Sequence, residues 1–220
     1  MTNEQEWFHQ FKQTDGFSEA LGMIWRFGHI QAGDTRFELS HKSIHVVSRF
    51  SSLIFGASEP RSYFRKDKGF IEWECHFNSS HPFLQEAKKM GWTPRLQQER
   101  QFPIGEFNES IFVKTYILMR HDVGIMREKT KNGILIRPRL RLHGSVDILR
   151  NLCRVLHQDL NIKPKKLQTD LKVERAKTIY YQSKKDIPAI LQYAGAIDAL
   201  AKYHDFELGY ENTREEVKCP

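Results

Sequence analysis

Three arginines alternate with apolar residues in the stretch ILIRPRLRLHG, which covers residues 134–144. Arg137, Arg139 and Arg141 stand at every second position. Side chains alternate between the two faces of a strand, so these guanidiniums share one face and the leucines between them face the core. A guanidinium forms paired hydrogen bonds with phosphate and with the edge of guanine. The pattern therefore predicts a surface that recognises nucleic acid; a solvated sheet face with no partner is the alternative.

The balance of charge favours the same interpretation. The chain has a formal net charge of +7 and a pI near 9.3. The excess is concentrated between Arg120 and Lys185, where seventeen basic residues face six acidic ones, a surplus of eleven. Such a concentration is typical of proteins that bind polyanions, because each cation placed on a phosphate releases condensed counterions.

Other residues are candidates for the same surface because they share a strand face or lie beside a predicted hairpin. Lysines at loop tips suit phosphates, which position a protein without reading sequence. Glu72 and Glu74 are expected to pair with neighbouring arginines. The further candidates are Arg36, Glu38, Arg61, Tyr63, Arg65, Lys66, Lys68, Arg127, Lys129, Lys131, Lys165, Lys166, Gln168, Lys172, Arg175 and Lys177.

Neither a metal nor a cofactor is expected. The three cysteines, Cys75, Cys153 and Cys219, are scattered without C-x-x-C spacing, and the ten histidines occur singly without metal-ligand spacing. No apolar run reaches the roughly 18 residues of a membrane span, and the polar start MTNEQEW does not resemble a signal peptide. We therefore expect a soluble, cytoplasmic protein associated with the nucleoid and not with membranes.

The two halves of the chain repeat one plan. Each is predicted to run helix, strand, strand, helix, strand, strand, helix, which makes an α+β protein of two similar units. The first helices contain ALGMIWRFG and YILMRHDVG, and each is expected to end at its glycine, Gly28 or Gly124. The last helix, capped by Ser183, is predicted to run unbroken through KKDIPAILQYAGAIDALAKYHDF. The expected boundaries are repeat one at 1–93, linker at 94–106, repeat two at 107–208 and a polar tail at 209–220.

This order of elements resembles the two-repeat LAGLIDADG family, which contains homing endonucleases and group I intron maturases. The resemblance implies two signature helices packed through small residues at a pseudo-twofold axis. It also implies two four-stranded antiparallel sheets that form a saddle over the DNA major groove. Gly22 and Gly28 match the signature in the first copy, and Gly124 matches it in the second, where Leu118 replaces the small packing residue.

The chain departs from the family where the family keeps its catalytic acids. In the family, a carboxylate at the foot of each signature helix holds divalent metal ions between the scissile phosphates. The overlay puts Phe27 and Val123 at these positions, and neither side chain can supply a hard oxygen ligand to Mg²⁺. Asp122 is one residue away, which on a helix is a rotation of about 100°. The resemblance therefore implies a protein that is not an enzyme.

Three functions follow from this resemblance. The favoured one is a sequence-specific repressor of a phage or other mobile element, which binds as a monomer to a pseudo-palindromic duplex site of ~20 base pairs. An active endonuclease with displaced acids and an intron RNA maturase are the alternatives. Duplex DNA is favoured over RNA because the deep, narrow major groove of A-form RNA would not admit a sheet.

Overall fold

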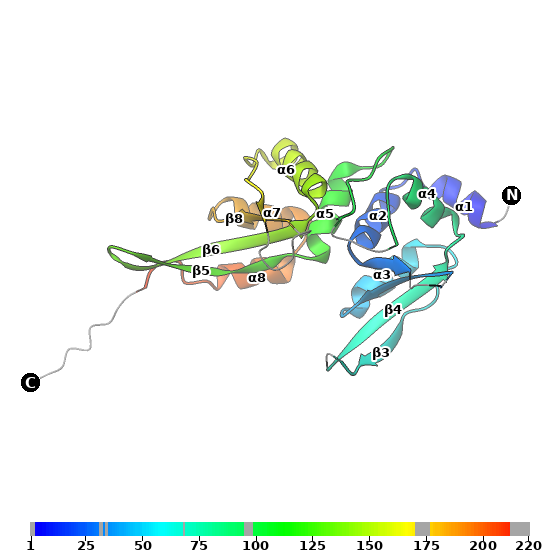
Figure 1. Ribbon diagram of the computed structural model, residues 1–220, viewed down its shortest axis with the longest axis horizontal. Coiled ribbons are helices and arrows are strands. Elements are labelled where there is room, and N and C mark those ends of the chain that lie inside the picture. The colour runs from blue at the N-terminus through cyan, green and yellow to red at the C-terminus, as the bar shows by residue number, and fades with distance from the viewer. Residues whose placement is uncertain are drawn as a thin grey trace, which may run out of the picture.

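Two helices, α2 (Asp15–Phe27) and α5 (Glu109–Met119), lie side by side at the centre of the molecule, with one half of the chain on each side of them (Figure 1). The computed structural model describes residues 3–30, 33, 35–67, 69–94, 99–169 and 177–211. Among these residues, no helix has both the length and the apolar character needed to cross a membrane.

The first half begins with a helix that the sequence did not predict, α1 (Asn3–Phe11). It forms because Trp7 and Phe11, one turn apart, stack with ring centroids 4.6 Å apart, and Phe11 packs edge-on against Phe83. The predicted order of elements follows it. These elements are α2, β1 (Gly28–Ile30), β2 (Arg36–His41), α3 (Ile44–Leu53), β3 (Arg61–Arg65), β4 (Phe70–Asn78) and α4 (Pro82–Lys89).

The second half repeats this order and then adds to it. Helix α6 begins where predicted, because the Ser145 hydroxyl accepts a hydrogen bond from the Ile148 amide. The elements are α5, β5 (Asp122–Thr130), β6 (Gly133–Gly144), α6 (Val146–Leu160), β7 (Gln168–Thr169), β8 (Lys177–Tyr181), α7 (Asp186–Ala194), α8 (Ile197–His204) and β9 (Gly209–Tyr210).

The two sheets have the same topology. The strand order is β1-β2-β4-β3 in the first sheet and β5-β6-β8-β7 in the second, with every neighbouring pair antiparallel. In Figure 1 the β5–β6 hairpin extends to the left beyond the helices, and the β3–β4 hairpin extends downward below them. The prediction of an α+β protein built from two αββαββα units is confirmed.

One face of each sheet forms the core, as the alternating patterns predicted. In the first sheet the buried strand residues include Phe37, Leu39, Cys75 and Phe77. In the second they include Leu140, Leu142, Ile179 and Tyr181. The residues between them project to the opposite face, which carries the polar side chains.

The central helix pair depends on one glycine. A Cβ atom at Gly22 would lie 2.8 Å from Thr115 Cβ and 3.0 Å from the Phe112 carbonyl oxygen. Only a residue without a side chain lets the two helices approach this closely. Trp25 packs edge-on against Phe112 nearby, with ring centroids 5.8 Å apart.

The second signature helix is shorter than predicted. Helix α5 ends at Met119, and Val123 and Gly124 lie in strand β5 opposite Leu140 and Arg139. In a continued helix the Ile117 carbonyl would accept a hydrogen bond from the His121 amide. Instead it accepts one from the Arg120 amide at 3.2 Å, and the His121 ring Nδ1 lies 3.0 Å from the same oxygen, so the helix stops. The assignment of Val123 and Gly124 to the foot of a helix was therefore wrong.

The end of the chain also differs from the prediction. The expected single last helix is two helices, α7 and α8, because Gly195 adopts a left-handed conformation with φ +71° between them. The predicted polar tail begins with a strand, β9, in which Gly209 and Tyr210 pair with Ile136 and Leu135 of β6. Residues 212–220 lie outside the described residues.

Candidate nucleic-acid interface

The polar face of the second sheet carries the predicted row of arginines. Arg137, Arg139 and Arg141 stand opposite Met126, Gly124 and Asp122, so all three project to one face. We call these three residues the arginine row. The arginine at its centre faces a glycine, which contributes no side chain, so the middle of the row is open.

Acidic residues neutralise the two ends of the arginine row. Arg137 Nε lies 3.2 Å from a Glu128 carboxylate oxygen, and Arg141 Nη2 lies 2.6 Å from an Asp122 carboxylate oxygen. The Arg137 side chain is still 46 % exposed, so the Glu128 pair competes with water. Among the described residues, Arg139 Nε is buried without a hydrogen-bond partner. The central arginine thus has unused capacity to donate.

Three predicted residues lie on the opposite face of the second sheet. Arg127, Lys129 and Lys177 stand opposite Ile136, Ile134 and Gly144, and this alternation turns them away from the arginine row. Arg127 pairs with Glu211 at 3.3 Å. The sequence shows which residues of one strand share a face. Arg127 and Lys129 belong to β5 and Lys177 belongs to β8, so the pairing register of these strands with β6 decides which face of the sheet they occupy. Gln168, opposite Thr178, shares the face of the arginine row.

The predicted lysines lie at several separate places. Lys131 is in the turn between β5 and β6, and Lys66 is in the turn after β3. Lys165 Nζ lies 3.4 Å from Asp186 at the start of α7, whereas Lys166 is exposed. The remaining predicted residues, Lys68, Lys172 and Arg175, lie outside the described residues.

The described polar face of the first sheet carries no surplus of positive charge. Its polar face carries three arginines and three glutamates, namely Arg36, Arg61, Arg65, Glu38, Glu72 and Glu74. Arg65 pairs with Glu72 at 3.0 Å and with Asp67 at 2.9 Å, as expected for a glutamate beside an arginine. The surplus of positive charge on strand faces therefore belongs to the second sheet.

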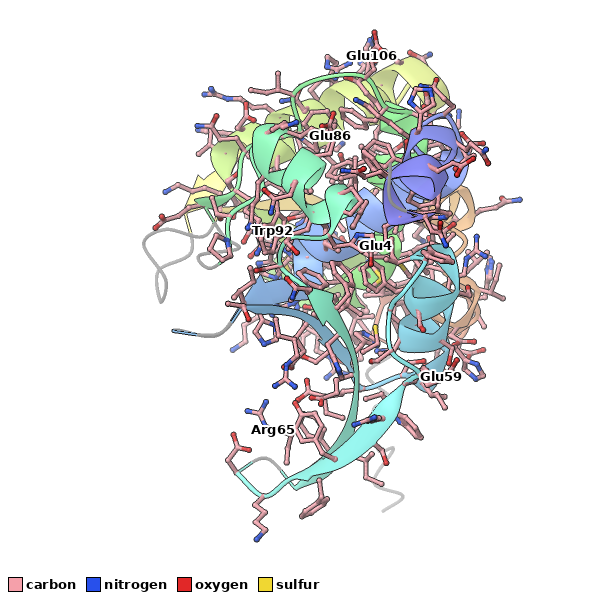
Figure 2. All side chains as sticks on the ribbon, turned by 90° about the vertical axis from the view of Figure 1, so that its right-hand side faces the viewer. Glu4, Glu59, Arg65, Glu86, Trp92 and Glu106 are labelled. Carbon is pink, nitrogen blue, oxygen red and sulfur yellow. The ribbon has the colours of Figure 1, made fainter. Side chains whose placement is uncertain are left out.

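A partly buried hydrogen-bond network links the edge strand β3 to β4 in the first sheet. The Tyr63 hydroxyl donates to Glu72 at 2.7 Å. Burial and this hydrogen bond raise the pKa of Tyr63 to about 12. Burial also raises the pKa of Glu38, although His29, 3.4 Å away, opposes the shift. In Figure 2, Arg65 lies near the free end of the β3–β4 hairpin, far from Glu86, which belongs to helix α4.

A cavity of about 610 Å³ lies at the foot of the two central helices. It joins both halves of the chain. The Phe27 ring packs edge-on against His41, with centroids 4.9 Å apart. The lining residues are Phe27, Ser40, His41, Lys42, Phe70, Glu72, Leu118, Met119, Arg120 and His121.

Solved structures share the fold of two repeated units, each with an antiparallel sheet. The I-SmaMI LAGLIDADG homing endonuclease bound to cleaved DNA has 9% sequence identity and a TM-score of 0.54, covering 86% of this chain and 88% of its own. The homing endonuclease I-WcaI bound to its DNA recognition sequence has 13% identity and a TM-score of 0.52, covering 92% and 88%. The chain has the two-repeat LAGLIDADG fold.

The N-terminal LAGLIDADG domain of DUF199/WhiA has 16% sequence identity and a TM-score of 0.48, covering 88% of this chain and 92% of its own. No family model and no curated protein matches the sequence.

The residues at the feet of the LAGLIDADG helices do not fit the divalent metal that the family resemblance implies. Helix α2 ends at Phe27, and α5 ends at Met119 with Arg120 as its cap. These are a phenyl ring, a thioether and a cation, none of which is a hard oxygen ligand. Among the described residues that line the cavity, the one carboxylate is that of Glu72, which accepts hydrogen bonds from Tyr63 and Arg65. Arg120, not Val123, stands at the foot of the second helix.

Sequence reasoning missed Arg100, a buried cation at the end of α2. Its guanidinium donates five hydrogen bonds of 2.6–3.0 Å to the carbonyls of Ile24, Trp25, Gly28 and Thr93. It also lies over the ring of Trp92, which is labelled in Figure 2, with Cζ 4.8 Å from the ring centroid. Burial lowers the pKa of Arg100 to about 9, so it stays charged at neutral pH. Arg100 lies in the predicted linker, residues 94–106, where the sequence has no pattern that indicates a buried cation at a helix end.

Proposed function

We propose that this chain binds double-stranded DNA sequence-specifically and does not cut it. The observation that carries the proposal is the arginine row, three guanidiniums on one face of an antiparallel sheet. Long side chains on such a face reach base edges in the major groove, and arginine on guanine is the commonest specific pair. The two homing endonucleases that share the fold are DNA-bound in their structures, which supports duplex DNA as the ligand.

The residues at the helix feet support binding without cleavage. Phosphodiester hydrolysis on divalent metals needs carboxylates that clamp the ions at the scissile phosphate. Phe27, Met119 and Arg120 stand there instead. A protein that holds a specific site and leaves it intact blocks polymerase, so we infer a repressor of a phage or another mobile element.

Selection of bound duplexes from a random library tests specific binding. We expect the Arg139→Ala variant to lose about 1–3 kcal/mol of discrimination at one base pair. The matched control is Lys129→Ala, on the opposite face of the hairpin, which should keep the same base preferences. Enrichment of no sequence, or the same enriched sequence from the Arg139→Ala variant, would contradict the proposal.

Incubation of the selected duplex with Mg²⁺ or Mn²⁺ tests the absence of cleavage. We expect the duplex to remain uncut, and a specific double-strand break would restore the endonuclease alternative. A gel shift against structured RNA tests the maturase alternative, for which binding tighter than that of the selected duplex would be decisive. For the repressor role, a promoter carrying the selected site should lose transcription when the protein is expressed.

A further inference from the structure

Arg26, in the last turn of α2, reaches across the repeat boundary to the second sheet. Its Nη1 atom donates to the Tyr116 hydroxyl at 3.1 Å and to the His143 carbonyl at 3.0 Å. Its Cζ atom lies 5.1 Å from the centroid of the buried Tyr116 ring. These contacts hold the guanidinium in one place at the end of strand β6.

The rest of this guanidinium has no partner. Among the described residues, the buried side-chain nitrogen and oxygen atoms without a hydrogen-bond partner are Arg26 Nε, Arg26 Nη2, Arg139 Nε and Arg141 Nε. All four belong to arginines on or beside β6. A buried donor left unsatisfied is costly, more so when it is charged. The unmet donors are therefore gathered in one region of the molecule.

Positive charge is concentrated in the same region. Burial, together with the charges of Arg26 and Arg141, lowers the pKa of Arg120, so Arg120 lies close enough to each of these cations to be repelled by it. Asp122 offsets one charge through its contact with Arg141. Three guanidiniums, those of Arg26, Arg120 and Arg141, and one carboxylate, that of Asp122, leave a surplus of two positive charges. We call Arg26, Arg120 and Arg141 the arginine cluster.

We propose that the arginine cluster is an anion site that takes one phosphate group of the DNA backbone. Guanidinium forks match phosphate oxygens with two parallel hydrogen bonds, and several arginines can satisfy one phosphate together. The assignment to DNA rests on the proposed function. Because Arg26 belongs to the first repeat and Arg120 and Arg141 belong to the second, the bound phosphate bridges the two halves. Fixed guanidiniums there neutralise the backbone charge without a divalent metal.

Inorganic phosphate tests the anion site without DNA. The Tm is measured in 20–50 mM phosphate and in chloride of equal ionic strength. For a millimolar Kd, such phosphate is in excess on the order of tenfold, so we expect the Tm to be about 4 °C higher in phosphate than in chloride. Arg26→Gln and Arg120→Gln should each abolish most of this rise. The control is Arg150→Gln, an exposed residue of α6, which should keep it. An equal Tm in both salts, or a rise retained by both cluster variants, would overturn the anion site.

The salt dependence of DNA binding tests the assignment to the backbone. On a selected duplex, Arg120→Gln should reduce the slope of log K against log[salt] by about 1, whatever the base sequence. Arg120 caps the end of α5 and takes no part in the hydrogen bonds of Arg26 to Tyr116 and His143, so this variant leaves those contacts in place. A phosphate-dependent rise in Tm with an unchanged slope would overturn the DNA assignment. A protein that responds to phosphate but binds no duplex would refute the proposed function and keep the anion site.

Discussion

Replacing Arg100 by methionine removes the buried cation that holds the end of helix α2. Methionine keeps much of the apolar bulk of the side chain and loses the guanidinium. The lost contacts are the five hydrogen bonds to the carbonyls of Ile24, Trp25, Gly28 and Thr93. The favourable interaction between a cation and the C-terminal end of a helix is lost as well.

The size of the effect follows from two opposing contributions. A hydrogen bond from a charged group stabilises a folded protein by ~1.5–3 kcal/mol. Five such bonds do not add fully, because two share the Thr93 carbonyl and the Ile24 carbonyl keeps its hydrogen bond from Trp92 Nε1. Burying the guanidinium also cost free energy, which the variant recovers. We therefore expect the free energy of unfolding to fall by about 3–5 kcal/mol.

Urea denaturation followed by tryptophan fluorescence measures this change. The control is Arg150→Met, at an exposed position on α6, which should change the free energy of unfolding by no more than about 0.5 kcal/mol. Arg100→Lys, which keeps a charge without the planar fork, should fall between the two. If Arg100→Met is as stable as Arg150→Met, the guanidinium does not hold the helix end.

Three further predictions concern packing and titration. Gly22→Val should destabilise the fold by about 1–3 kcal/mol in urea denaturation, whereas Gly124→Val, which meets no atom within 4 Å, should not; equal losses would refute the close helix packing. In Glu72→Gln, the pKa of Tyr63 should fall from about 12 toward its usual value, because the hydrogen bond to the Glu72 carboxylate and the charge of that carboxylate both raise it; the phenolate absorbance missing from Tyr63→Phe identifies the step, and an unmoved step would refute the contribution of Glu72. Burial raises the pKa of Cys75 to about 12, so this thiol should react with a disulfide reagent at about pH 8 only after unfolding; rapid labelling of the native protein would contradict its burial.

Local patterns in the sequence were sufficient for the repeated plan of the fold. Phe37 and Leu39 alternate with polar residues in the sequence, a pattern that marks the core face of a strand, and both residues are fully buried. Ser145 precedes a stretch with apolar residues at helical spacing, a pattern that marks the start of a helix, and it caps α6. Such signals depend on neighbours within a few residues, so they can be read without knowing the rest of the fold.

The candidate site was predicted in part for the same reason. The sharing of one face by Arg137, Arg139 and Arg141 follows from the alternation of a single strand. Arg127 lies on the face of the second sheet away from the arginine row, and Arg65 pairs with Glu72 in the first sheet. Both facts depend on how separate strands align. Register is fixed by pairing between strands, which the spacing of residues within one strand does not contain.

The sequence by itself determined the order of the elements, the core faces of the strands and the identity of the residue that ends α2, Phe27. Only the tertiary structure decided where α5 ends, that Arg100 holds α2, and that Arg26 meets β6. The physical reason is separation along the chain. Arg100 binds carbonyls 72–76 residues away and Arg26 binds one 117 residues away, so neither partner exists until the two halves of the chain come together.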